Sequence, residues 1–301
     1  MNEGNLLIKI ATRSSKLALF QANLVGRGLG VPYELVEVHS GGDLDLKSPL
    51  SAIGGAGIFV KEVQAAVIRG EADIAVHSAK DIPAQLPSET TVDTFIRRGD
   101  PRDCLVGADL ASLKVGAVVA TGSTRRRALI KVLRPDLEIV ELRGNIATRL
   151  ERLGDVDAIL MANAALERLD LRTVKRQVFE VDEFMPQVGQ GAIAVERRRD
   201  DERVASILLN VNDPKTQMAV EAERGFLGTI GSGCTLPVGA YATVSSGRIY
   251  MSALIAAVDG SSLIKRAQSG EEPRLLGSEL GELILSEGGR QLLDQAELDS
   301  K

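Results

Sequence analysis

The sequence predicts an α/β fold that is divided into more than one domain. Segments rich in β-branched residues alternate with segments whose apolar residues recur at helical spacing, which is the pattern of α/β layers. A chain of 301 residues is too long for one ordinary hydrophobic core, so two or three domains are expected. Hydrophobic residues make up 44% of the chain and charged residues 26%, which is the composition of a soluble globular protein.

The first part of the chain predicts one α/β unit. Strands are expected at residues 6–11, 33–38 and 73–76, and helices at 16–29 and 58–69. A glycine follows each helix and ends it. The stretch 97–103 interrupts the alternation with charged residues, glycine and proline, so we place a hinge there.

A second α/β unit is expected after this hinge. Its strands are predicted at 115–120, 139–142 and 158–162, and its helices at 125–133 and 146–153. Residues 185–191 form a second hinge-like loop, and a strand at 192–196 returns to the first unit. From about residue 214 an α+β segment follows, with a helix through 221–227, strands near Ala240 and at 248–257, and a helical tail. The expected domains are 1–97 with 192–209, 98–191, and 214–301.

Composition and charge argue against several classes of function. The net charge of −5, from 36 basic and 41 acidic residues, provides no general field that attracts polyanions. The absence of Trp and the scarcity of Phe and Tyr argue against nucleic-acid binding by base stacking. No signal peptide and no apolar run of membrane-spanning length is visible. Two cysteines do not form a disulfide framework, so a cytoplasmic location is expected.

Three basic turns stand where a predicted strand gives way to a helix, at residues 12–15, 121–127 and 143–149. Free N–H groups at a helix start favour an anion, and guanidinium groups grip carboxylates with two hydrogen bonds. A single arginine is more often surface charge, and Arg127 fits that description. Three such turns together favour a ligand with several carboxylates. Phosphate is the competing anion, but the chain has no nucleotide-binding glycine motif.

Two further places could carry chemistry. Lys80 and Asp81 follow a short buried strand, where the carboxylate could stabilise a cation or move a proton, or merely cap a helix. Cys234 lies in a turn bounded by glycine and proline, which would present a reachable thiol, although most lone cysteines are inert and buried. His77 is expected to be a partly buried histidine with its hydrogen bonds made. No spacing of histidine and cysteine suggests a metal site.

Taken in order, these residues resemble the porphobilinogen deaminase family, also called the hydroxymethylbilane synthase family. The resemblance covers nearly the whole chain, and its motifs are weak singly but specific together. The matching stretches are residues 10–15, 59–62, 73–81, 100–103, 125–126, 142–145, 148–150 and 188–192, and Gly233-Cys234 followed by Pro237 and Gly239.

The resemblance implies two periplasmic-binding-protein-like α/β domains around a cleft and a smaller α+β C-terminal domain. Cys234 would hold a dipyrromethane cofactor through a thioether. The implied transferase joins four porphobilinogen molecules head to tail on this primer and releases ammonia at each step. Hydrolysis then frees hydroxymethylbilane for tetrapyrrole and haem biosynthesis. A monomer without nucleic-acid or membrane partners is expected.

The resemblance also assigns roles to residues. Catalytic roles fall to Asp81, Lys80, Arg13, Arg126, Arg143 and Arg149. Cofactor-binding roles fall to Cys234, Ser15, Lys80, Asp81, Ser123, Arg125, Arg126 and Gln190. Substrate carboxylates would be bound by Arg13, Arg143, Arg149 and Arg168, and the glycine-rich residues 54–57 would form a mobile flap.

The chain departs from the family pattern at three places. Ala56 stands where the family commonly has lysine, and Gly41 where it often has arginine. Both changes remove possible anion contacts, which puts the strength of product-chain binding in question. Gly231 and Ser232 replace the usual residues before Gly233-Cys234 but leave the thiol in place.

Two other functions compete with this one. A two-lobed protein that binds a small dicarboxylate without catalysis would account for the arginines and the hinges, but not for Cys234 or for Asp81 beside Lys80. A nucleic-acid protein that uses residues 125–127 is opposed by the acidic net charge and the scarce aromatic residues.

Overall fold

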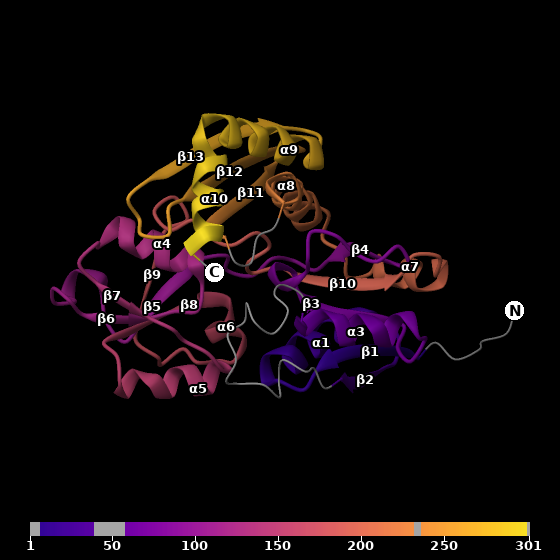
Figure 1. Cartoon of the computed structure of the whole chain (residues 1–301). Helices are drawn as coiled ribbons and strands as arrows, with labels where there is room; N and C mark the ends of the chain where they lie inside the picture. The colour runs from indigo at the N-terminus through magenta and orange to yellow at the C-terminus, as the bar shows by residue number, and fades with distance from the viewer. Residues whose placement is uncertain (1–6, 39–57, 232–235, 300–301) are drawn as a thin grey trace, which may run out of the picture. The chain divides into compact units, whose positions relative to one another are not determined.

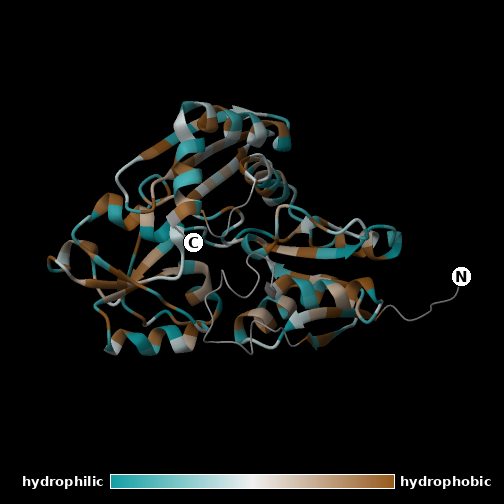
Figure 2. Cartoon of the chain, in the orientation of Figure 1, coloured by the Kyte–Doolittle hydropathy of each residue, from teal (hydrophilic) through white to brown (hydrophobic). Residues whose placement is uncertain are grey.

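The computed structural model describes residues 7–38, 58–231 and 236–299 (Figure 1). The chain forms two compact units. Unit 1 contains residues 1–98 and 192–217, and unit 2 contains residues 99–191 and 218–301. Apolar residues gather in the strands of each sheet and on the helix faces that cover them (Figure 2).

Unit 1 is built on a five-stranded sheet with the order β2-β1-β3-β10-β4. Four strands run in the same direction, and β10, between β3 and β4, runs antiparallel to both. The strands are β1 (Ile8–Arg13), β2 (Tyr33–Val38), β3 (Ile74–Ser78), β4 (Thr90–Phe95) and β10 (Ile193–Arg198). Strand β10 corresponds to the strand predicted at 192–196, which returns the chain to the first unit. It places residues from distant parts of the sequence in one sheet.

Helices cover both faces of this sheet, because successive side chains of a strand point to opposite sides. Ile10 packs with residues of α1 (Lys16–Gly28) and α7 (Glu202–Leu208). Ala11, the next residue, packs on the other face with residues of α3 (Ile58–Ile68).

Unit 2 contains a second five-stranded sheet with the order β7-β6-β8-β5-β9. Again four strands run in the same direction, and here β5, between β8 and β9, is antiparallel to both. The strands are β5 (Asp103–Val106), β6 (Val118–Ala120), β7 (Glu138–Val140), β8 (Ala158–Ala162) and β9 (Arg176–Val178). Helix α4 (Thr124–Leu133) packs on one face, and α5 (Ile146–Glu151) and α6 (Asn163–Arg168) pack on the other.

The C-terminal part of unit 2 is a three-stranded antiparallel sheet with helices on one side. Its strands are β11 (Val238–Ser245), β12 (Arg248–Ala256) and β13 (Leu263–Gly270), and its helices are α8 (Pro214–Ile230), α9 (Pro273–Ile284) and α10 (Arg290–Asp299). The first four residues of α8 belong to unit 1. Leu254 and Ala256 of β12 belong to the same hydrophobic core as Leu129 of α4 and Phe184. The second and third sheets therefore share one core.

The predicted fold class, two α/β sheets followed by a smaller α+β region, is confirmed. Strands β4, β5, β9 and β13 were not predicted. Asp103 begins strand β5, so the hinge expected over residues 97–103 is wrong at its last residue. Cys104, Leu105 and Val106 are fully buried and pair with β8 on one side and β9 on the other. This apolar run explains why a strand begins at the end of the charged stretch. No helix in the described ranges is long and apolar enough to cross a membrane.

Candidate functional site

Unit 1 gathers four of the predicted site residues at one edge of its sheet. Strands β1 and β3 are parallel neighbours, so their carboxyl ends meet at the same edge. Arg13 is the last residue of β1, and Ser15 caps α1 by accepting a hydrogen bond from the Ala18 N–H at 3.3 Å. At the end of β3 the 3-10 turn η1 (Ala79–Asp81) follows and carries Lys80 and Asp81.

A pocket of about 80 Å³ lies at this edge. Arg13 and Asp81 line it together with Ser15, so it combines a cation, a carboxylate and a hydroxyl. Gln21 and Ser78 also line the pocket, and the Gln21 amide donates to the Ser78 hydroxyl at 3.0 Å. Such a pocket can hold a small polar molecule that carries both acidic and N–H groups.

A buried histidine that also lines the pocket pairs with a carboxylate and supports β3. His77 is 5% exposed, and its Nε2 lies 3.0 Å from Oε2 of Glu196 on β10. Gln64 of α3 donates to the same carboxylate. Burial raises the pKa of Glu196, but hydrogen bonds from His77 and Gln64 outweigh this effect and leave the pKa below its ordinary value. The prediction of a buried histidine with its hydrogen bond made is confirmed.

Unit 2 gathers the other predicted arginines at the corresponding edge of its own sheet. The parallel strands β6, β7 and β8 end there, and α4, α5 and α6 begin there. Ser123 caps α4 by accepting from the Arg126 N–H at 3.4 Å. The arginines on these loops and helices are Arg125, Arg126, Arg143, Arg149 and Arg168.

The two loops that carry these arginines approach each other closely. A Cβ at Gly122 would lie 2.6 Å from the Leu142 carbonyl oxygen, so only glycine fits at this position. Arg149 donates from Nε to the Gly144 carbonyl at 2.8 Å, which fixes the loop that carries Arg143. The arginines are therefore held by packing of the loops.

Arg125 and Arg126 share one buried counterion. Asp103 is fully buried, and Arg125 and Arg126 are only 3% and 6% exposed. Arg126 donates from Nε to Asp103 Oδ1 at 2.8 Å, and Arg125 Nη2 lies 2.8 Å from Asp103 Oδ2. Burial raises the pKa of Asp103, but the two guanidinium groups outweigh it and hold the pKa low. Among the described residues the cluster has two cations and one carboxylate, so it carries excess positive charge.

One buried hydrogen-bond donor of Arg125 lacks an acceptor among the described residues. Its Nη1 donates to the Met185 carbonyl at 2.6 Å, and its guanidinium lies 5.9 Å from the centre of the Phe184 ring. Its Nη2 makes the ion pair with Asp103, whereas its Nε is buried and forms no hydrogen bond with any residue that the structure describes. Burial lowers the pKa of Arg125 despite the nearby carboxylate. A buried donor without an acceptor is unfavourable, so this cluster favours an added acceptor.

Gln190 and Arg168 complete the predicted set in unit 2. Gln190 is fully buried and donates from Nε2 to the Pro101 carbonyl at 2.8 Å and to Asp103 Oδ1 at 3.0 Å. Its Oε1 accepts from Arg126 at 3.4 Å, which brings Gln190 and Arg126 together. Arg168 donates to the Gly191 carbonyl at 2.6 Å, and burial lowers the pKa of Arg168 to about 10.

Sequence reasoning missed Asp103, because a charged residue beside glycine and proline indicates a loop. The apolar run Cys104–Val106 was the available signal of a buried strand.

Cys104 is buried, and burial raises its pKa to about 12, so its thiol is a poor nucleophile. Cys234, Ser232, Gly41, Ala56 and the predicted flap lie outside the described residues. Among described residues, no group of His, Cys, Asp and Glu could hold a metal ion.

Comparison with known proteins gives a consistent result along the chain. Residues 8–206 match the family model "Porphobilinogen deaminase, dipyromethane cofactor binding domain", and residues 217–286 match "Porphobilinogen deaminase, C-terminal domain". The porphobilinogen deaminase of Roseiflexus castenholzii is 43% identical over 95% of this chain and 98% of its own length. Those of Syntrophobacter fumaroxidans and Brevibacillus brevis are 40% and 41% identical over 96% and 95% of this chain, and over 97% and 96% of their own lengths.

Solved structures with a related arrangement include two periplasmic proteins. The periplasmic VFT2 domain of BvgS from Bordetella pertussis is 17% identical with a TM-score of 0.40, over 68% of this chain and 86% of that one. A TRAP periplasmic solute binding protein from Desulfovibrio salexigens is 13% identical with a TM-score of 0.41, over 69% of this chain and 73% of that one.

Proposed function

Because this chain belongs to the porphobilinogen deaminase family, we propose that it joins four porphobilinogen molecules into hydroxymethylbilane on a dipyrromethane primer held by Cys234. The chain is thus a transferase that releases one ammonia for each molecule added. The alternative of a dicarboxylate-binding protein without catalysis is not favoured, because relatives at 40–43% identity over nearly the whole chain are porphobilinogen deaminases.

The observation that carries this proposal is the buried cluster of unit 2. Arg125 and Arg126 share the carboxylate of Asp103, and the buried Nε of Arg125 forms no hydrogen bond with any described residue. Dipyrromethane carries acetate and propionate arms, so its carboxylates would supply both the missing charge and the missing acceptor. The residues therefore fit the group. Ser123 and Gln190 would assist the two arginines.

The sequence position of Cys234 supports attachment in the same unit. Residues 218–230 of helix α8 precede it and strand β11 follows it, and both belong to unit 2, as does the arginine cluster. The bound dipyrromethane would supply the terminal pyrrole on which the product chain is built. Its covalent attachment keeps that end of the chain fixed while the other end grows.

The pocket of unit 1 would bind and activate the substrate. Asp81 would accept hydrogen bonds from pyrrole N–H groups and stabilise the cation that remains when ammonia leaves, with proton transfer as a second role. Arg13 and Lys80 would neutralise substrate carboxylates, and Ser15 would donate a hydrogen bond. The buried His77–Glu196 pair holds β3, and so supports the turn that carries Asp81.

The remaining arginines would bind the growing chain. Each added pyrrole brings two more carboxylates, so the demand for cations increases with chain length. Arg143 lies in the loop before α5, Arg149 lies on α5, and Arg168 is the last residue of α6. They would bind different pyrroles. A monomeric, cytoplasmic protein stays a prediction.

Intact mass of the purified protein tests the proposal. The wild type is expected to be heavier than its polypeptide by two pyrrole units, whereas Cys234→Ser should have the mass of the bare chain. Cys104→Ser is the matched control, because Cys104 is buried and should leave the adduct in place. An adduct on Cys234→Ser would disprove the attachment site. Wild-type protein without an adduct that is inert toward porphobilinogen would disprove the function.

A further inference from the structure

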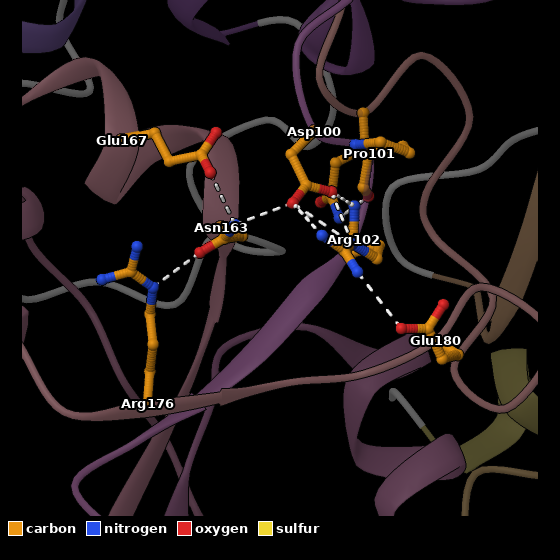
Figure 3. A network of polar contacts seen from close by, with 8 residues as sticks. Asp100, Pro101, Arg102, Asn163, Glu167, Arg176 and Glu180 are labelled. Carbon is orange, nitrogen blue, oxygen red and sulfur yellow. Dashed lines mark hydrogen bonds and ion pairs between the residues drawn. The ribbon is translucent and has the colours of Figure 1, made fainter. Parts of the chain in front are cut away.

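Asn163 stands at the centre of a polar network in unit 2 (Figure 3). It is the first residue of α6 and is 2% exposed. Its Nδ2 donates to Asp100 Oδ2 at 2.8 Å and to Glu167 Oε1 at 3.1 Å, and its Oδ1 accepts from Arg176 Nε at 2.7 Å. Both amide hydrogens are used. Because ionised carboxylates only accept and guanidinium groups only donate, the amide has one possible orientation.

The two main partners of Asn163 are themselves held in place. Arg176 donates from Nη1 to the Leu171 and Val174 carbonyls at 3.1 and 3.3 Å. Asp100 accepts from the backbone N–H, the Nε and the Nη2 of Arg102, each at 2.9 Å. Asn163 therefore links two fixed groups, and its hydrogen bond to the Asp100 carboxylate is charge-assisted.

The network continues from Asp100 to the arginine cluster along the backbone. The Asn163 N–H donates to the Arg102 carbonyl at 3.0 Å, and Gln190 donates to the Pro101 carbonyl at 2.8 Å. The segment from Asp100 to Asp103 is thus held by Asn163 and by Gln190 at successive residues. Asp103 at its end is the shared counterion of the two buried arginines.

We propose that Asn163 is a positioning residue for the cofactor site: its side-chain amide fixes the segment 100–103, and so sets where Asp103 places Arg125 and Arg126 for the cofactor carboxylates. The proposal rests on the function proposed above. Asn163 acts only through Asp100 and the segment, and it does not touch the reacting groups. Glu167 is exposed, so the contacts that matter are those with Asp100 and Arg176.

Asn163→Asp tests the proposal with almost no change of shape. It replaces the two donors with a carboxylate that faces Asp100, while it can still accept from Arg176. We expect kcat/KM for porphobilinogen to fall about tenfold, since small displacements of a binding group cost one to two orders of magnitude in rate. The fraction of molecules that carry the covalent adduct, measured by intact mass, should fall as well.

Exchanging the two partners should restore part of the function. In Asp100→Asn combined with Asn163→Asp, the new amide at position 100 can donate to the new carboxylate at position 163, which still accepts from Arg176. Arg102 can keep its two hydrogen bonds to the Oδ1 of residue 100 but loses the one from its Nη2. Both kcat/KM and the adduct fraction should therefore recover to at least about threefold above those of Asn163→Asp, because a restored contact couples the two mutations. Glu180→Gln is the control: Glu180 joins the network only through Arg102, its side chain is 78% exposed, and its loss should change nothing.

The outcomes separate the proposal from a purely structural role. A lower urea-unfolding midpoint of Asn163→Asp with wild-type kcat/KM and adduct fraction would overturn it, and so would failure of the exchanged pair to recover. If Asn163→Asp does not fold, Asn163→Ala should show the same losses, and adding Asp100→Asn to it should not restore them. Wild-type protein with neither adduct nor turnover would instead disprove the proposed function.

Discussion

Replacing Asp103 by Asn tests whether the buried cluster of unit 2 carries excess positive charge. The change keeps the shape of the side chain but leaves Arg125 and Arg126 buried without a counterion. Removing one partner of a buried ion pair costs about 3–5 kcal/mol. For a unit of this size each kcal/mol lowers the unfolding temperature by about 2–4 °C, so a loss of about 6–20 °C is expected.

The assay is thermal unfolding followed by circular dichroism at 222 nm, in protein with and without the covalent adduct. If cofactor carboxylates also contact the two arginines, the loss in Asp103→Asn should be smaller when the adduct is present. Asp136→Asn is the matched control, because the Arg134–Asp136 pair lies at the far end of the same helix and is partly exposed. It should shift the unfolding temperature far less.

Two results would contradict the role of Asp103 as the shared counterion in the cofactor site. A loss below about 2 °C in adduct-free Asp103→Asn would mean that the two guanidinium groups do not need the carboxylate. Equal losses with and without the adduct would mean that the cofactor carboxylates do not compensate the arginines, and would remove Arg125 and Arg126 from the proposed cofactor site.

Three further predictions concern single residues. Asp81→Ala should keep the adduct and the unfolding temperature but lose most turnover, and near-normal turnover in a steady-state assay would remove Asp81 from the mechanism. Arg143→Ala and Arg149→Ala should accumulate enzyme-bound chains of different length by mass spectrometry, and identical chain lengths would contradict separate pyrrole sites. The hydrogen bonds from Arg102 outweigh burial and lower the pKa of Asp100 in the folded protein. The ionised Asp100 therefore stabilises the fold fully above the pKa of an unfolded aspartate, about 3.9. This stabilisation is lost as the pH falls through the lower pKa of the folded state. The difference in unfolding free energy between wild type and Asp100→Asn should therefore stay constant from about pH 7 to 5 and close toward pH 2, whereas a difference that grows in acid would contradict the assignment.

The sequence was enough to predict which residues lie at the edges of the two sheets. Strands β1, β3 and β8 are apolar runs followed by small polar residues or a helix start, so the carboxyl-end rule placed Arg13 and Asp81 at one edge. The burial of Arg125 and Arg126 was also partly visible, since apolar residues follow them at helical spacing. Local pattern and topology were enough for these residues.

The side chains that contact those residues could not be predicted from the neighbouring sequence. Asp103 becomes buried only because β8 and β9 pair on either side of it, and β9 has only three residues, too few for a periodic pattern. Asn163 lies 63 residues from Asp100 and 13 from Arg176 in the chain. Nothing in the residues next to Asn163 indicates either contact. Strand β4 is different: its three threonines together with Val92 and Phe95 have the β-branched and aromatic composition of a strand, a usable signal that was missed.

The core shared by the second and third sheets constrains how this protein can diverge. Leu254 and Ala256 of β12 pack in the same interior as Leu129 of α4, so a change of volume on one element has to be matched on the other. A chimera that takes residues 218–301 from a relative would bring a β12 surface shaped for a foreign α4. Such hybrids should fold well only when the apolar residues of α4 are transplanted with them.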